Sequence, residues 1–93
     1  MFYTYVLLSQ KDKKFYIGYT GNLNKRLEEL RNGKVTATKN RGNFILVYYE
    51  ACLNKHDAIK REKYFKTGFG RRFFNNRLEN YFSGSRWRAG IIN

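Results

Sequence analysis

A glutamate on the apolar face of a predicted helix is the residue of this sequence that most strongly suggests chemistry. Glu62 lies three or four positions from Ala58, Ile59 and Phe65, so the helical repeat sets its carboxylate among apolar side chains. Burial of a carboxylate costs several kcal/mol unless a cation, a metal ion or several hydrogen-bond donors compensate. Glu62 is therefore either a functional ligand or one half of a structural ion pair with an arginine.

Arg26, the second candidate, borders the apolar stripe of an earlier predicted helix. It follows Leu23 by three positions and precedes Leu30 by four, which sets it beside that stripe rather than on the solvent face. A guanidinium there could pair with Glu62 or hold a phosphate through its planar fork of N–H donors. The simpler interpretation is an arginine whose aliphatic stem packs along the stripe while its charge stays in water.

Two tyrosines, Tyr5 and Tyr16, are the third candidates, because they fall on neighbouring predicted strands, eleven positions apart. A phenol can donate or accept a hydrogen bond, and it can move a proton in a reaction. Most buried tyrosines only pack and satisfy one hydrogen bond. The pair therefore suggests chemistry only if the fold brings it together with Glu62 and Arg26.

The predicted strands supply the frame for these residues. Aromatic and β-branched residues predict strands over 2–8 and 15–19, and the polar turn 9–14 joins them into an antiparallel hairpin. A third apolar strand is predicted over 44–49. The first strand is apolar on both faces, which favours a central position in the sheet.

The predicted helices carry Arg26 and Glu62. Asn22 is expected to cap a helix that ends at Gly33, and Asn54 to cap a helix that ends near Gly68. A last helix is predicted over 71–82. Its expected apolar face consists of Phe74, Leu78, Tyr81 and Phe82.

The order β-β-α-β-α-α predicts an α/β domain with a three-stranded antiparallel sheet flanked by helices. We expect this domain to span residues 1–83, followed by a C-terminal tail over 84–93. A chain of 93 residues suffices for a single core.

The charge of the chain points to a polyanionic partner. Nineteen Lys and Arg against seven Asp and Glu give a formal net charge of +12 and a pI near 10.1. Nucleic acid is the first candidate and an anionic membrane surface the second. No segment approaches the ~18 apolar residues of a membrane span, and one cysteine cannot build a disulfide framework. We expect a cytoplasmic protein, monomeric by default, with no membrane and no small-molecule cofactor.

The run Tyr16-Ile17-Gly18 is identical to the second half of the GIY-YIG nuclease signature. Tyr3-Thr4-Tyr5 stands at the place of the first half and keeps its final tyrosine, at the family's usual separation. A helix with Arg26 and a helix with Glu62 follow in the family's order. The chain therefore resembles the small stand-alone bacterial GIY-YIG domain proteins over about residues 2–82.

This resemblance implies a metal-dependent endonuclease that hydrolyses DNA phosphodiester bonds with one Mg²⁺ or Mn²⁺ ion. Glu62 matches the family's metal-binding glutamate, since a hard cation that keeps several waters needs few protein ligands. Arg26 matches the arginine that offsets charge on the phosphoryl oxygens. Tyr5 and Tyr16 match the signature tyrosines, one of which positions or deprotonates the attacking water. Gly18 would leave room for DNA beside the strand.

Two positions depart from the family's pattern. Leu30 stands four residues after Arg26, where many relatives have a histidine or a tyrosine. Asn76 is the candidate for an asparagine in the closing segment, although helical phasing turns it away from the apolar face of its helix. The alternative to a nuclease is a non-catalytic nucleic-acid-binding module on the same fold. A basic protein–protein adaptor is a third interpretation, but it leaves Glu62 unexplained.

The other basic residues near these elements are expected to contact the DNA backbone. Such contacts give affinity with a steep salt dependence and little sequence readout. They lie before the third strand and around the end of the second helix: Lys34, Lys39, Arg41, Lys63, Lys66, Arg71 and Arg72. For any single one of them, a solvated surface charge is the simpler interpretation.

Overall fold

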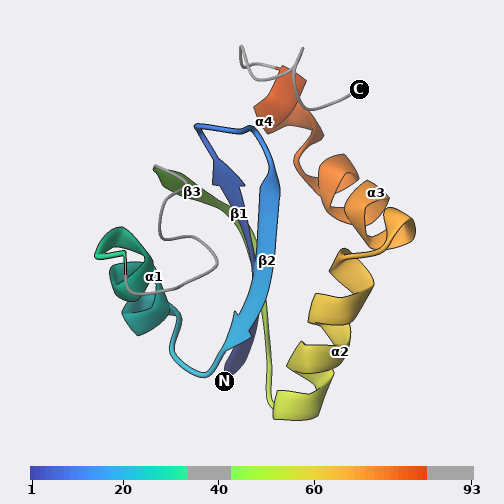
Figure 1. Ribbon diagram of the computed structural model, residues 1–93. Helices are drawn as coiled ribbons and strands as arrows, with labels where there is room; N and C mark the ends of the chain where they lie inside the picture. The colour runs from blue at the N-terminus through green and yellow to red at the C-terminus, as the bar shows by residue number, and fades with distance from the viewer. Residues whose placement is uncertain (34–42, 84–93) are drawn as a thin grey trace.

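A three-stranded antiparallel sheet with helices on both faces forms the domain, as the sequence predicts. The computed structural model describes residues 1–33 and 43–83. In Figure 1, α1 covers one face of the sheet, α2 and α3 cover the other, and α4 lies near the turn between β1 and β2. The elements are β1 (Phe2–Ser9), β2 (Phe15–Thr20), α1 (Leu23–Arg31), β3 (Phe44–Cys52), α2 (Lys55–Phe65), α3 (Gly68–Arg77) and α4 (Glu79–Ser83). Within the described ranges, no helix has the length and apolar character needed to cross a membrane.

The central strand is β1, because the strand order is β2-β1-β3. This position explains why every residue from Thr4 to Ser9 is buried. The register sets Tyr5 opposite Gly18 of β2 and opposite Tyr49 of β3. β2 is therefore an edge strand, and its outer side is open to side chains from both faces of the sheet.

The core lies between the sheet and the pair α2–α3. Val6, Phe65 and Phe74 are fully buried, and Phe15 packs edge-on against Phe74 with ring centroids 5.0 Å apart. Burial of each such side chain stabilises the fold by about 1.5–3 kcal/mol. On the same face, the Thr4 hydroxyl donates to the carbonyl of Ala58 at 2.9 Å. These contacts fix α2, the helix of Glu62, against β1 and β2.

Local capping signals are confirmed at three helix ends. The Asn22 side chain accepts from the backbone N–H of Lys25, and the Asn54 side chain accepts from that of His56. Gly33 follows α1 with φ +70°, the left-handed conformation that glycine adopts without a steric penalty. Each signal acts within a few residues, which is why the sequence alone could predict it.

The C-terminal helices differ from the sequence prediction. Gly68 begins α3 rather than ending α2, because the Thr67 hydroxyl accepts from the Gly70 N–H and caps the new helix. The predicted helix 71–82 is also wrong as a single element, since α3 ends at Arg77 and α4 begins at Glu79. This interruption changes the helical phase and leaves Tyr81 43% exposed, whereas Phe82 is buried.

An ion pair between β3 and α2 holds these elements together at the other edge of the sheet. The Arg61 Nε and Nη2 atoms donate to the two Glu50 carboxylate oxygens at 2.8 and 2.9 Å, and the Tyr48 hydroxyl donates to the same carboxylate at 2.9 Å. The hydrogen bonds from Arg61 lower the pKa of Glu50, against burial, which acts in the opposite direction. The Arg61 guanidinium also stacks over the rings of Tyr64, Phe65 and Phe73.

We expect this pair to make the fold acid-sensitive. Because the pKa of Glu50 is lower in the folded than in the unfolded chain, its stabilisation is complete above the ordinary value of 4.5. The stabilisation is lost as the pH falls through the lowered pKa. Glu50→Gln should lower the free energy of unfolding at neutral pH by on the order of 1 kcal/mol, since the pair is partly solvated. The same change should make the free energy of unfolding less dependent on pH below 4.5. Urea unfolding between pH 2 and 7 measures the loss of stability and its pH dependence. If variant and wild type lost stability equally at low pH, the stabilising role of Glu50 would be contradicted.

Candidate active site

A groove at the β2 edge of the sheet brings together three of the side chains singled out in the sequence, Tyr5, Arg26 and Glu62. Its volume is about 620 Å³. These three residues come from β1, α1 and α2, which are far apart in the chain and adjacent at this edge. The full lining is Phe2, Tyr5, Ile17, Gly18, Tyr19, Thr20, Gly21, Arg26, Lys55, Glu62 and Lys66.

The groove wraps around the edge strand. Arg26 comes from α1 and contacts Tyr5, whereas Glu62 comes from α2. These two helices cover opposite faces of the sheet (Figure 1). Along β2, Gly18 shares the face of Tyr5, while Ile17 and its neighbour at position 19 point to the α2 side. Side chains from both faces meet here because β2 has no strand on its outer side among the described residues.

Gly18 allows the Tyr5 ring to cross β2. A Cβ atom at residue 18 would clash with the Tyr5 hydroxyl and would lie 2.6 Å from the Tyr5 Cζ atom. The hydroxyl of a central-strand tyrosine can therefore reach the sheet edge only over a glycine. That Gly18 leaves room for DNA stays a prediction: Gly18 is buried against Tyr5, yet it lines the groove.

Arg26 holds the Tyr5 hydroxyl. Its Nη1 atom donates to the Tyr5 oxygen at 2.9 Å, and its Nε atom lies 3.4 Å from a Glu29 carboxylate oxygen. Burial alone would lower the pKa of Arg26, but the Tyr5 hydrogen bond and the charge of Glu29 outweigh burial and raise it. Since a guanidinium only donates, the Tyr5 oxygen is the acceptor and its own proton points elsewhere. Tyr5 can therefore donate to an oxygen atom in the groove.

Glu62 is mostly buried but keeps access to the groove, with its side chain 19% exposed. Its ion-pair partner is Lys66, one turn later on α2, with Nζ 3.3 Å from Oε2. The possible pairing with Arg26 is not formed, since Arg26 pairs with Glu29. Lys66 is 55% exposed, so the pair is solvated and weak. The carboxylate can therefore exchange Lys66 for another cation.

The donor set fits a magnesium-type ion completed by substrate. In the described part of the chain, no three His, Cys, Asp or Glu side chains gather to hold a metal ion. This excludes a closed zinc site or a calcium cage built from those residues. Mg²⁺ and Mn²⁺ suit one carboxylate together with waters and substrate phosphate oxygens. Glu62 is the acidic side chain that lines the groove.

Tyr16 does not line this groove. Its register partner is Leu7, which sets it on the face of Tyr5 but diagonal to it. The Tyr16 hydroxyl donates to an Asp12 carboxylate oxygen at 3.0 Å, and its ring packs edge-on against Phe44 with centroids 5.3 Å apart. The expectation that both signature tyrosines share the site with Glu62 is therefore met only by Tyr5.

Asn76 is also separate from the groove. It is exposed on α3 and does not belong to the lining. Its neighbour Asn75 has a buried side-chain oxygen with no hydrogen-bond partner among the described residues. Within residues 1–33 and 43–83, no asparagine lines the groove.

The expected backbone-binding residues fall into three groups. Lys66 lines the groove, and Lys63, Arg71 and Arg72 are exposed around the junction of α2 and α3. Lys34, Lys39 and Arg41 lie outside the described residues. The positive charge beside the groove thus comes from α1, α2 and the start of α3.

Among the lining residues that sequence reasoning missed are Tyr19 and Lys55. Lys55 precedes Glu62 by seven positions, which places it on the same face of α2, so the helical repeat could have identified it. Tyr19 lies on the opposite face of β2 from Gly18. No local signal marks β2 as the edge strand, and only that position brings Tyr19 into the same groove.

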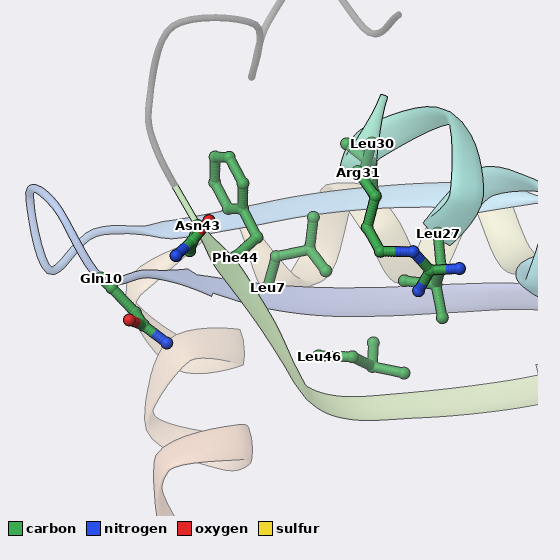
Figure 2. A pocket seen from close by; sticks show the side chains of 8 residues that line it. All are labelled: Leu7, Gln10, Leu27, Leu30, Arg31, Asn43, Phe44 and Leu46. Atoms are coloured by element: carbon green, nitrogen blue, oxygen red, sulfur yellow. The ribbon is translucent and has the colours of Figure 1, made fainter. Parts of the chain in front are cut away.

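A second groove lies between α1 and the sheet and has a different character (Figure 2). Its volume is about 570 Å³, and side chains of Leu7, Leu27, Phe44 and Leu46 converge on it from β1, α1 and β3. Leu30 lines this groove, and Gln10, Arg31 and Asn43 add polar groups to it. The residue four positions after Arg26 therefore lies in this second groove and does not line the groove at the β2 edge.

The strand order β2-β1-β3 and the order of the elements are compatible with a nuclease-type domain of GIY-YIG architecture. The model of the family described as "GIY-YIG catalytic domain" matches residues 1–75. The chain therefore belongs to the GIY-YIG family.

Curated relatives support this assignment. The chain is 43% identical to a UPF0213 protein of Clostridium perfringens over 67 residues, which cover 71% of each chain. It is 38% identical to a UPF0213 protein of Limosilactobacillus reuteri over 70% of each chain. A UPF0213 protein of Pediococcus acidilactici is 41% identical over 70% of this chain and 68% of its own. The comparison with solved structures gave no match.

Proposed function

We propose that this protein is a metal-dependent endonuclease that hydrolyses DNA phosphodiester bonds in the groove at the β2 edge. The observation that carries the proposal is the convergence of Tyr5, Arg26 and Glu62 from three elements on that groove. Membership of the GIY-YIG family supports the nuclease class. The net charge of +12 favours a polyanionic substrate.

Arg26 and Tyr5 act on the scissile phosphate and the attacking water. The Arg26 guanidinium is partly exposed and can offer N–H donors to the phosphoryl oxygens as negative charge builds on them. Tyr5, held by Arg26, donates its hydroxyl proton to an oxygen in the groove and so orients the water. Their mutual hydrogen bond fixes both groups before substrate arrives.

Glu62 would hold the Mg²⁺ or Mn²⁺ ion on the α2 side of the groove. When bound there, such an ion supplies charge stabilisation to the phosphate and to the leaving oxygen. Lys66, released from Glu62, would then turn to a neighbouring phosphate of the DNA. Lys55, on the same helical face, adds a second cation for the backbone.

The groove geometry predicts that the two signature tyrosines differ in importance. Tyr5→Phe removes the oxygen that Arg26 holds and should lower the rate of nicking by about 100-fold. Tyr16→Phe removes a hydroxyl that binds Asp12 outside the groove and should have a smaller effect. The assay is nicking of supercoiled plasmid with Mg²⁺ or Mn²⁺, and with EDTA as the metal-free control.

Tyr81→Phe provides a matched control, because Tyr81 is an exposed tyrosine that does not line the groove. It should nick at the wild-type rate. A larger loss for Tyr16→Phe than for Tyr5→Phe would contradict the role assigned to Tyr5. Equal residual nicking by wild type and all variants would indicate a contaminating nuclease and would overturn the proposal.

One observation favours the alternative of a non-catalytic nucleic-acid-binding module. Leu30 lines the groove of Figure 2, between α1 and the sheet, and offers no group for proton transfer one turn after Arg26. Such a module would bind DNA with a steep salt dependence and show no nicking in either metal. Binding that Glu62→Gln leaves intact, without nicking by wild type, would support it.

A further inference from the structure

The junction of α2 and α3 presents an exposed aromatic ring next to the active-site groove. We call residues 63–72 the α2–α3 corner. Phe69, in its middle, is 73% exposed, although single exposed apolar residues are common on protein surfaces. The other aromatic residues between positions 63 and 74 are buried or half-buried: Tyr64, Phe65, Phe73 and Phe74. Exposure of Phe69 is therefore a local exception within an otherwise packed aromatic segment.

The chain segment around Phe69 is rich in basic residues. Residues 63–78 contain five Lys and Arg and no Asp or Glu. Lys63, Lys66, Arg71 and Arg72 are all exposed, and the Arg72 guanidinium lies over the Phe69 ring, 5.8 Å from its centroid. The nearest carboxylate given by an ion pair is that of Glu62, which holds Lys66 at 3.3 Å. A flat apolar ring among mostly basic side chains matches the chemistry of nucleic acid, which offers base faces beside phosphates.

Stacking on Phe69 requires a base whose face is free. In an intact duplex, each base is covered by its neighbours, so a protein ring can reach a face only where a base is unpaired or unstacked. Cations alone would suit an acidic protein equally well. The exposed ring and the continuity with the groove favour DNA instead.

The corner and the groove share a residue. Lys66 lines the groove and precedes Phe69 by three positions, a chain distance of at most ~10 Å. A DNA strand bound at the corner would therefore continue into the groove within a few nucleotides.

We propose that the α2–α3 corner binds DNA at an unpaired base, which stacks on Phe69 while Lys66, Arg71 and Arg72 contact the flanking phosphates. This inference rests on the proposed nuclease function and specifies its substrate as DNA with unpaired bases, such as a bulge or a single-stranded segment. Intact duplex binds only through the phosphate contacts.

The test measures binding without cleavage, in EDTA and in a Glu62→Gln background, so that it does not depend on nuclease activity. Fluorescence anisotropy compares an intact duplex with the same duplex carrying a two-base bulge that contains 2-aminopurine. The Glu62→Gln protein should bind the bulged DNA about 10-fold more tightly than the intact duplex. Stacking should also quench the 2-aminopurine fluorescence. Adding Phe69→Ala should abolish that preference and the quenching, with affinity for intact duplex within about 2-fold.

Two further variants make the result specific. Phe69→Trp keeps a stacking ring and should retain the bulge preference, whereas Tyr81→Ala removes an exposed aromatic residue outside the corner and should change nothing. Unchanged bulge affinity in Phe69→Ala would overturn the proposal. Equal weakening on both DNAs would also overturn it, as would binding of acidic peptide in place of DNA. If the wild type fails to nick plasmid but shows the preference, the nuclease function fails and the DNA surface stands.

Discussion

Replacement of Glu62 by glutamine is expected to reduce nicking of supercoiled DNA by at least about 100-fold while leaving the fold intact. Glutamine has nearly the shape of glutamate but no charge, so it cannot hold Mg²⁺ or Mn²⁺ in the same way. Glu62 is the acidic side chain in the groove, and in the part of the chain that the structure describes no other carboxylate lines the groove to replace it. The loss should persist at high metal concentration.

The structural cost of this change is small. The Glu62–Lys66 pair is solvated, and pairs of this spacing contribute about 0.3–0.5 kcal/mol. Urea unfolding should therefore show nearly wild-type stability. Removal of a negative charge from a groove that receives phosphate should also keep or raise affinity for DNA in the absence of metal. Reduced activity with retained binding separates a metal ligand from a residue that only supports the fold.

Glu28→Gln is the matched control for this experiment. Glu28 is exposed on α1 and does not line the groove, so the same chemical change there should leave nicking unchanged. Nicking by Glu62→Gln at the rate of Glu28→Gln would show that Glu62 holds no essential ion. In that case the family resemblance would extend to the fold without the chemistry.

The largest effect on stability is expected for Gly70→Ala. A Cβ atom at residue 70 would clash with the carbonyl oxygen of Tyr64 and would lie 2.6 Å from the Cα atom of Phe65. Both are backbone atoms of α2, which cannot move without separating α2 from α3. We expect a loss of about 3 kcal/mol or more, a large fraction of the stability of a small domain.

Gly68→Ala is the matched control for Gly70→Ala. Gly68 lies two residues earlier in the same helix, and a Cβ atom there would point into open space. Alanine loses less conformational entropy in a helix than glycine, so this variant should be unchanged or stabilised by up to about 1 kcal/mol. Thermal unfolding should separate the two variants by more than about 10 °C. Similar melting temperatures would show that α2 and α3 are not packed this closely.

Sequence alone determined the features that depend on residues close together in the chain. Asn22 and Asn54 cap their helices, and Gly33 ends α1, because each acts through a hydrogen bond or a backbone angle within one turn. The order of strands and helices followed from hydrophobic periodicity for the same reason. Glu62 stood out because a single helix repeat exposes the conflict between a carboxylate and its apolar neighbours.

Tertiary structure decided how these elements combine into a site. The choice of Tyr5 over Tyr16 depends on strand register and on Gly18, which lets the Tyr5 ring cross β2. The pairing of Glu62 with Lys66 rather than Arg26 follows from α1 and α2 covering opposite faces of the sheet. The groove exists because β2 is an edge strand, where side chains from both faces can meet. These contacts join residues that are far apart in the chain, so no local sequence pattern predicts them.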